Sequence, residues 1–500
     1  MLSVFAAACS SGGSKKAADV LSEKSITMPV NVLKDKIRGG WAGQTIGVVY
    51  GAPTEFKYQG STVQDDQPIP WNSGYIKYWW DKKPGLFDDI YNDLTFVEIF
   101  ENKGLDVSVD TIARHFAASE YHLAHANQQA RYNIRQGLKP PASGSWINNP
   151  HADDIDFQIE SDFIGLMTPG MVNTATGVAD RVGHIMNSGD GWYGGVFTSS
   201  LYSLAFVSSD VNYIVSEACN CIPEGTKFHD CISDVIKWHR QYPDDWQRCW
   251  FELHKKWNYD VGCPKGVFLS FNIDAKLNAA YVALALLYGK GNFTKSVDIA
   301  ARCGQDADCN PSTVGGVLGV MKGYSSIPSF WRDPLSEIES LNFQGTDISL
   351  EKANMLSYKH ATQWIKKEGG SVSESQVTIP LSKPVPVAFE QNFNKTYPVS
   401  REKVDLSISD SYSFSFRGNG FVLFGNLIKN SSISRDYLDR VLNKYGSEVF
   451  ALAEPGDPYV AHLQLFIDGR VDQDIIMPVK NSSRRLEPAW KYLLPEGKHS

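Results

Sequence analysis

The stretch CGQDADCNPSTVGGVLGVMKGYSSIP, residues 303–328, places two aspartates beside a long run of small and apolar residues. Three glycines between residues 315 and 319 predict a helix that packs closely against its neighbours. Asp306 and Asp308 are expected in the loop before that helix. Two carboxylates so close repel each other and are costly to desolvate unless a cation lies between them. The pattern is consistent with a metal site and also with a helix cap.

A second glycine-rich segment, GQTIGVVYGAPTEF, covers residues 43–56. Its glycines at 43, 47 and 51 are four apart, a spacing that brings one face of a helix close to its neighbour. Gly-Ala-Pro at 51–53 then ends the helix and delivers Glu55 just beyond it. A carboxylate at such a turn can act as a general acid or base, or can position water. A surface glutamate after a helix stop is the alternative.

A third segment, GLFDDIYNDLTF from residue 85, carries three acids at the expected start of a helix. Asp88 and Asp89 lie where the helix dipole and free N–H groups stabilise anions, so helix capping is one interpretation. Asp93 is one turn after Asp89 and therefore lies on the same face. Three acids together favour a hard cation with oxygen ligands, such as Mg²⁺, Mn²⁺ or Ca²⁺.

Length and composition restrict the class of protein. With 500 residues, two or three domains are expected. The net charge of −8 and the absence of a dense Lys/Arg stripe argue against nucleic acid as a partner. The longest apolar stretches, such as AAYVALALLYG from Ala279, are too short to span a bilayer.

The first residues, MLSVFAAACSSGGSKK, resemble the end of a bacterial lipoprotein signal. Cys9 follows three alanines and precedes a Ser/Gly linker, so residues 1–25 are predicted to be a signal remnant and linker, with Cys9 lipidated. Such a protein would be exported and would lie in the periplasm or at the outer-membrane surface, held to the membrane only by its lipid. The other cysteines lack zinc-site spacing, and most are predicted to be buried small hydrophobic residues.

The pattern of the chain changes near residue 370. Residues 26–370 show helical periodicity and little strand-like alternation, which predicts an all-α domain. Residues 371–500 alternate with period two, which predicts a smaller β-sandwich. HLQLFIDGRVDQDIIMPV, residues 462–479, reads as a hairpin with Asp468-Gly469 at its turn. The final residues stop where another strand should begin, so the sandwich is predicted to lack its closing strand.

Taken together and in this order, the three acidic segments resemble the ADP-ribosylglycohydrolase family, which includes dinitrogenase-reductase-activating glycohydrolases. That family carries G-x-x-x-G-D-A-L-G-A-P-x-E, then T-D-D-T, then G-G-D-T-D-T before a small-residue helix. Here the first motif reads GQTIGVVYGAPTEF and the third reads GQDADCN. CIPEG from residue 221, Gly319, Gly323, Ile327-Pro328 and Trp331 also match the family's sequence.

The resemblance implies a compact all-α fold with a binuclear Mg²⁺ or Mn²⁺ centre. Its implied metal ligands in this chain are Asp88, Asp89, Asp306 and Asp308. Phe87 and Ile90 stand where the family has threonines, and Cys309 replaces the final hydroxyl residue. Asp93 would substitute for one of the lost hydroxyl ligands and give an all-carboxylate site.

Two further segments are candidates for substrate binding. NNPHADDIDFQIESDFIGLMTPG, from residue 148, contains Asp154 and Asp162 at about the position of the family's substrate-contacting loop. NSGDGWYGG, residues 187–195, offers Asp190 and Trp192 in a glycine-rich loop suited to stacking against a sugar. A polar surface loop is the alternative for both segments.

These observations predict a metal-dependent hydrolase of a ribosyl-type N- or O-glycosidic bond, with Glu55 as acid or base. An ADP-ribosyl conjugate, a riboside or a furanosyl glycan would be its small-molecule or glycan substrate. The predicted sandwich favours the glycan by analogy. The alternative is a non-catalytic carbohydrate-binding surface lipoprotein on a degenerate hydrolase scaffold.

Overall fold

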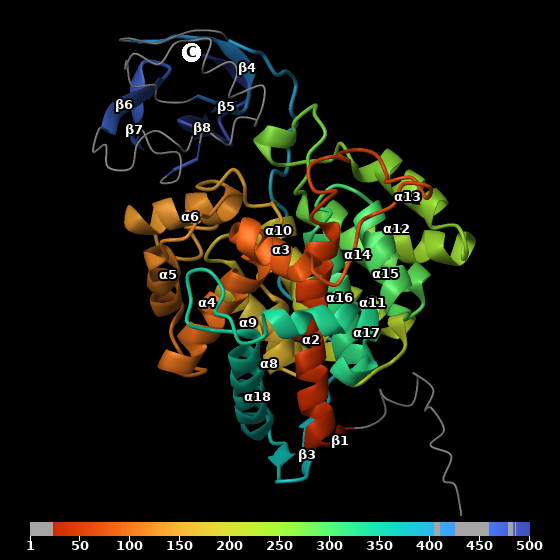
Figure 1. Cartoon of the computed structure of the whole chain (residues 1–500). Helices are drawn as coiled ribbons and strands as arrows, with labels where there is room; N and C mark the ends of the chain where they lie inside the picture. The colour runs from red at the N-terminus through yellow and green to blue at the C-terminus, as the bar shows by residue number, and fades with distance from the viewer. Residues whose placement is uncertain (1–23, 405–410, 426–459, 479–483, 486) are drawn as a thin grey trace, which may run out of the picture.

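The computed structural model describes residues 24–404, 411–425, 460–478, 484–485 and 487–500. Cys9 lies outside these residues. The described chain is mainly helical, as predicted, and its helices form one body with the C-terminal strands gathered at one end (Figure 1). The α-helices are α2 (Val30–Gly51), α3 (Tyr75–Lys82), α4 (Asp88–Lys103), α5 (Val109–Ala118), α6 (His125–Arg135), α7 (Asp156–Ile159), α8 (Asp162–Met167), α9 (Val172–Gly183), α10 (Gly189–Ala205), α11 (Val211–Cys219), α12 (Lys227–Gln241), α13 (Trp246–Trp257), α14 (Ala275–Gly289), α15 (Phe293–Arg302), α16 (Cys309–Lys322), α17 (Ser329–Arg332) and α18 (Leu350–Lys367).

The remaining elements are short. The 3₁₀ turns are η1 (Pro84–Phe87), η2 (Pro264–Gly266), η3 (Tyr324–Ser326) and η4 (Asp333–Glu337). The strands are β1 (Ser25–Pro29), β2 (Ser371–Val372), β3 (Gln376–Pro380), β4 (Phe416–Gly418), β5 (Phe421–Leu423), β6 (Val460–Ile467), β7 (Arg470–Pro478), β8 (Ala489–Lys491) and β9 (Gly497–His499).

Helices α2 and α16 pack backbone against backbone at the centre of the body (Figure 1). A Cβ added at Gly43 would lie 2.0 Å from the carbonyl oxygen of Gly315. The same addition at Gly47 would lie 2.0 Å from the carbonyl oxygen of Pro311. Any larger residue on this face would drive the helices apart, because backbone atoms cannot yield as a flexible side chain can. The predicted close packing of both glycine-rich helices is confirmed.

The core around this crossing is built from wholly buried helices. Every residue of α10 and α14 is buried, so neither helix has a face exposed to solvent. Among the described helices, none has the length and hydropathy required to cross a bilayer. The seven cysteines of the described chain are all buried and free of disulfides, as most were predicted to be.

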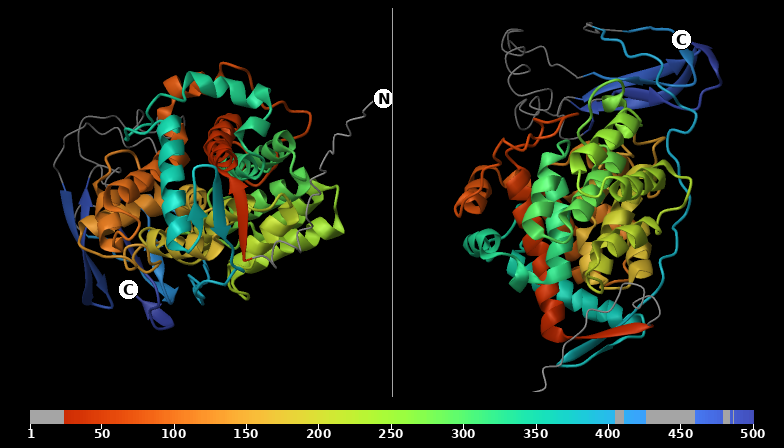
Figure 2. Two further views of the ribbon diagram at one scale, coloured as in Figure 1. Left: turned by 90° about the horizontal axis from the view of Figure 1, so that it is seen from below. Right: turned by 90° about the vertical axis from the view of Figure 1, so that its right-hand side faces the viewer.

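A small sheet joins the strand that precedes the first helix, α2, to the strands that follow the last helix, α18. Strand β3 pairs antiparallel with β1 and with β2, and Ser25 lies opposite Pro380 (Figure 2). Strand β3 lies within residues 371–500, which were predicted to form a β-sandwich, but it belongs to this sheet. The alternating pattern of β3 predicts a half-buried strand but does not indicate which strand pairs with it. The pairing strand, β1, comes from the start of the described chain. The chain after β3 then runs along the helical body, and the amide of Val387 donates to the carbonyl of Cys221 (2.9 Å).

The C-terminal strands form three antiparallel pairs within the described residues: β4 with β9, β5 with β8, and β6 with β7. The predicted hairpin is confirmed, because Asp468 and Gly469 both have positive φ (51° and 77°) between β6 and β7. These described pairs do not show two packed sheets, so the β-sandwich and its missing closing strand remain predictions.

Candidate metal centre and active site

The ends of α2 and α16 deliver three of the predicted acids to one place. The turn after α2 is closed by the amide of Thr54, which donates to the carbonyl of Gly51 (2.8 Å), and Glu55 follows directly. At the other helix, Asp308 occupies the cap position and accepts a hydrogen bond from the amide of Cys309 (3.0 Å). The crossing of the two helices therefore fixes where the carboxylates meet.

Glu55 is bonded directly to the loop that carries Asp306 and Asp308. Its Oε2 accepts hydrogen bonds from the amides of Ala307 (2.6 Å) and Asp308 (3.3 Å). Its Oε1 accepts from the amide side chain of Asn272 (2.7 Å). Three donors hold this carboxylate in one orientation, which is what a group that transfers a proton requires.

Asp88 and Asp89 begin α4 and face the same point. The thiol of Cys309 donates to Oδ1 of Asp89 (3.1 Å) and lies 3.6 Å from Oδ1 of Asp308. Cys309 thus belongs to two groups of ligand atoms that lie within 4.8 Å of one another: one with Asp88 and Asp89, the other with Asp306 and Asp308. We call Glu55, Asp88, Asp89, Asp306 and Asp308 the carboxylate cluster.

The carboxylate cluster is crowded with like charge. Burial and the charge of Asp308 raise the pKa of Asp89 to about 8. Burial, together with the charges of Asp308 and Asp306, raises the pKa of Glu55 well above its usual value. No ion pair between described residues joins these carboxylates to a lysine or arginine.

This chemistry fits a hard divalent cation. Oδ2 of Asp89 has no hydrogen-bond partner among the described residues, although it is buried. Carboxylate oxygens are the ligands that Mg²⁺ and Mn²⁺ prefer, and a bound cation would relieve the repulsion between the acids. The residues that would hold it are Asp88, Asp89, Asp306 and Asp308.

Asp93, one turn after Asp89 on α4, lies beside Asp162 at the start of α8. The two acids share hydrogen bonds from Gln44. Gln44 donates from Nε2 to Asp93 (3.1 Å) and to Asp162 (2.9 Å), and the hydroxyl of Tyr202 donates to Asp162 (2.8 Å). Burial raises the pKa of Asp162 to about 8, and burial plus the charge of Asp162 raises that of Asp93. The structure therefore pairs the proposed ligand Asp93 with Asp162 instead of placing it among the loop aspartates. Asp162, predicted to contact substrate, is 1% exposed and held inside the body.

Asp190 and Trp192 are also inside the body. The glycine-rich segment predicted as a loop is the start of α10, where the glycines allow close approach: a Cβ at Gly191 would lie 2.2 Å from the carbonyl oxygen of Ala152. Trp192 is 1% exposed and stacks on Tyr193, with ring centroids 5.1 Å apart. Its face is covered by core residues and is not free to stack on a sugar. Glycines selected for helix packing were misread as loop glycines.

Asp190 belongs to a buried cluster of compensated charge. Lys276 is fully buried; its Nζ lies 3.2 Å from Oδ1 of Asp274 and 3.9 Å from Oδ2 of Asp190. The amide of Asp190 donates to Asp153 (3.1 Å). Burial raises the pKa of Asp190 to about 6, although the charge of Lys276 opposes this shift. We call Asp153, Asp190, Asp274 and Lys276 the lysine cluster.

Asp154, the remaining predicted substrate residue, is fully buried beside two histidines and a cysteine. It accepts a hydrogen bond from Nδ1 of His151 (2.7 Å). It is thus separate from the carboxylate cluster.

Sequence reasoning missed the asparagines that support the loop of Asp306. Oδ1 of Asn278 accepts from the amide of Asp306 (3.3 Å) and from Nδ2 of Asn310 (2.8 Å), and Asn272 holds Glu55. The available signal was Asn278 itself, which with Lys276 is one of two strongly polar residues near the start of the otherwise apolar sequence of α14. Nothing in the sequence indicated that Asn272 faces Glu55, 217 residues away.

Comparison with known proteins gives the following matches. A solved structure described as "ADP-ribosylglycohydrolase-related protein complex" is similar to 66% of this chain and 98% of its own, with 14% identity and a TM-score of 0.42. No curated protein matches the chain. The family model described as ADP-ribosylglycohydrolase matches residues 29–358, well over half of the chain. The chain therefore belongs to the ADP-ribosylglycohydrolase family.

Proposed function

We propose that this protein is a metal-dependent hydrolase of a ribosyl-type N- or O-glycosidic bond, with the carboxylate cluster as its active site. The observation that carries the proposal is the convergence of Glu55 with the aspartates of two helix N-termini, without a lysine or arginine ion pair among the described residues. Acids crowded in this way fit an oxygen-ligated divalent cation better than they fit a structural role.

The proposed roles follow from the contacts. Asp88 and Asp89 on α4, with Asp306 and Asp308 before α16, would hold Mg²⁺ or Mn²⁺, as a binuclear pair if all four act as ligands. Bound cations would supply positive charge for the adjacent hydroxyls of a furanose and for a water molecule. Glu55, fixed by Asn272 and the loop amides, would act as general acid or base at the anomeric bond.

The substrate proposal rests on family membership and on the C-terminal strands. Ribosyl conjugates, ribosides and furanosyl glycans share the furanose ring that the cluster would hold. We favour a glycan because strand-rich modules often bind carbohydrate, an argument by analogy. Export and lipidation at Cys9 are part of this proposal; a Cys9→Ala variant should move from the membrane fraction to the soluble fraction, and unchanged fractionation would contradict anchoring.

The central experiment is a screen for sugar released from ribosides, arabinosides and ADP-ribose conjugates, with and without Mg²⁺ or Mn²⁺. We expect release from one substrate class only when a divalent ion is present. Asp308→Asn should abolish release, whereas Asp244→Asn should not, because Asp244 is 85% exposed and pairs with Lys290. Release that continues in the presence of a chelator would contradict metal dependence.

A second candidate function is a non-catalytic carbohydrate-binding protein on the same scaffold. The favouring observation is Cys309, whose thiol donates to Asp89 where the family has a hydroxyl residue. A non-catalytic carbohydrate-binding function predicts that the protein binds a glycan but does not bind a divalent ion at the carboxylate cluster. Calorimetric titration with Mg²⁺ and Mn²⁺ separates the two functions, since only the hydrolase requires the ion.

A further inference from the structure

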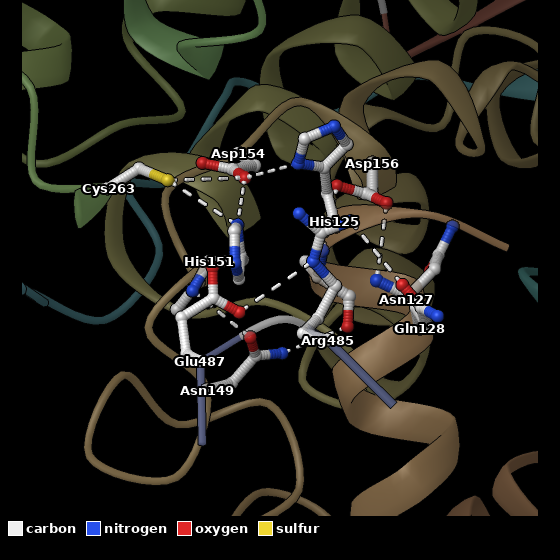
Figure 3. A network of polar contacts seen from close by, with 12 residues as sticks. His125, Asn127, Gln128, Asn149, His151, Asp154, Asp156, Cys263, Arg485 and Glu487 are labelled. Carbon is white, nitrogen blue, oxygen red and sulfur yellow. Dashed lines mark hydrogen bonds and ion pairs between the residues drawn. The ribbon is translucent and has the colours of Figure 1, made fainter. Parts of the chain in front are cut away.

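Two histidines, an aspartate and a cysteine from three separate segments point toward one another near the C-terminal strands (Figure 3). His125 is the first residue of α6, His151 and Asp154 lie in the loop before α7, and Cys263 precedes η2. The side chains of His151 and Asp154 are fully buried, Cys263 is 1% exposed, and His125 retains 14% exposure. We call these four residues the histidine–cysteine cluster.

Three ligand atoms of the histidine–cysteine cluster lie around a single oxygen. Oδ2 of Asp154 lies 2.7 Å from Nδ1 of His151, 3.3 Å from Nδ1 of His125 and 3.6 Å from Sγ of Cys263. Oδ1 of Asp154 is buried and has no hydrogen-bond partner among the described residues. A network built for hydrogen bonding alone would share donors between both oxygens, because each has two lone pairs. The side chains are instead aimed at one point.

Three of the distances between these ligand atoms fit a tetrahedral zinc site. With Zn–N near 2.0 Å and Zn–S near 2.3 Å, neighbouring ligand atoms of a tetrahedron are about 3.3–3.7 Å apart. Sγ of Cys263 lies 3.4 Å from Nδ1 of His151 and 3.6 Å from Oδ2 of Asp154. The distance from His125 to Asp154, 3.3 Å, also fits. The 2.7 Å hydrogen bond between His151 and Asp154 must lengthen to admit the ion.

The chemical type of the ligands separates this cluster from the carboxylate cluster. Imidazole and thiolate suit Zn²⁺, whereas Mg²⁺ and Mn²⁺ prefer oxygen. Zn²⁺ with the thiolate of Cys263 and the carboxylate of Asp154 sums to zero charge, so the complex suits a buried position. Binding releases the thiol proton of Cys263 to solvent.

Outer contacts orient the histidine ligands. Nε2 of His151 lies 3.1 Å from Oε1 of Glu487, leaving Nδ1 to face the other ligands. A carboxylate on the far nitrogen is the usual outer partner of a zinc-bound histidine. Nδ2 of Asn149 donates to the carbonyl of Ala126 (2.9 Å), which fixes the start of α6 against this loop. His125 there adopts a left-handed backbone (φ 44°), which non-glycine residues rarely adopt.

We propose that His125, His151, Asp154 and Cys263 form a structural Zn²⁺ site, distinct from the carboxylate cluster, and that Glu487 links this site to the C-terminal strands. Four protein ligands complete the coordination, so the site is structural and not catalytic. The occupant is the metal ion alone.

The test uses the full chain produced in minimal medium supplemented with Zn²⁺ or with Co²⁺. We expect one equivalent of zinc per chain after gel filtration and, for the cobalt protein, a thiolate-to-cobalt charge-transfer band with intense tetrahedral d–d bands. Cys263→Ser should remove the charge-transfer band and lower zinc affinity at least about 100-fold. Cys249→Ser is the matched control, because Cys249 is a buried cysteine of α13 that belongs to no group of candidate metal ligands among the described residues, and it should keep both properties.

Two further variants keep the proposal open to contradiction if Cys263→Ser does not fold. His125→Ala, at the more exposed ligand, should retain the charge-transfer band but lose the tetrahedral intensity. Glu487→Gln should weaken zinc binding about 10–100-fold. Asp306→Asn should leave the zinc content unchanged, so failure of the proposed hydrolase and failure of this site are distinguishable. A chain that takes up neither zinc nor cobalt, or a Cys263→Ser variant with an unchanged cobalt spectrum, would overturn the proposal.

Discussion

The carboxylate cluster and the lysine cluster are both groups of buried acids, yet only one of them contains its own cation. In the lysine cluster, Nζ of Lys276 lies 3.2 Å from Asp274 and donates to the carbonyl of Asp260 (2.9 Å). The carboxylate cluster is contacted instead by Cys309, which offers a neutral thiol and no positive charge. A buried acid that is paired with a cation costs the folded state little free energy. Unpaired buried acids destabilise the fold unless a bound ligand compensates their charge. The comparison assigns the lysine cluster to structure and the carboxylate cluster to binding.

The largest effect is expected from removing one acid of the carboxylate cluster. Asp306→Asn or Asp308→Asn should abolish divalent-ion binding and reduce turnover to background, while the helical fold persists because like-charge repulsion falls. Isothermal titration with Mn²⁺ measures the loss of ion binding, and circular dichroism measures whether the helical fold persists. Full ion occupancy in either variant would show that these aspartates are not ligands.

The opposite result is expected in the lysine cluster. Lys276→Met leaves Asp190 and Asp274 buried without their cation and should cost about 3–5 kcal/mol of unfolding free energy. Divalent-ion binding should be retained at temperatures where the variant is folded. Chemical denaturation and Mn²⁺ titration measure the two quantities. A variant as stable as the parent chain would remove the contrast between the clusters.

Glu55 distinguishes holding the ion from performing chemistry. Glu55→Gln keeps one acceptor oxygen, which can serve the loop amides, but it replaces the oxygen that accepts from Asn272 and cannot exchange a proton; turnover should therefore fall about 100-fold or more with substrate still bound. Steady-state kinetics and a direct binding assay check the prediction. Unchanged turnover would exclude Glu55 from the reaction.

The smallest effect is expected at a titratable ion pair of the segment after β3. Burial alone would lower the pKa of His184, but hydrogen bonds to Asp180 and Glu390 raise it to about 10. The pair with Glu390 (3.0 Å) should contribute about 1.5–3 kcal/mol. Because the folded pKa exceeds the unfolded value of 6.5, this stability is fully present below pH 6.5 and is lost as pH rises toward 10.

Denaturation of the parent chain and of His184→Gln between pH 6 and pH 10 measures that contribution. The stability difference should be largest at pH 6 and should shrink steadily toward pH 10. A difference that grows with pH would contradict the assignment of His184 as the protonated partner.

Much of the helical fold and the five acids of the carboxylate cluster could be predicted from local sequence patterns. The glycines of α2 and α16 have the spacing that a close helix crossing needs, and the crossing is observed. The acids at 88–89 and at 306–308 stand at helix starts, where the sequence signals are strongest. Helix register and caps are set by residues three or four apart, so they are visible in a single sequence.

The partners of buried groups were not readable in this way. Asp93 shares a helix face with Asp89, yet Gln44 and Asp162 determine its environment. Trp192 sits among glycines, yet core packing covers it. Strand β3 shows its alternation, yet its pairing with β1 joins residues more than 340 positions apart. Such choices depend on which distant surfaces exclude water together, and a local pattern does not contain that information.

The sequence by itself determined the helices, the glycine faces on which α2 and α16 pack closely and the presence of acids at the starts of α4 and α16, whereas the structure showed that the two glycine faces pack on each other. Only the tertiary structure decided which acids lie beside the positive charge of Lys276 and which acids have no such partner among the described residues. It likewise brought His125, His151 and Cys263 together around Asp154 and placed Glu487 behind them. The physical reason is that periodicity and capping act along the chain, whereas burial and charge compensation act across it.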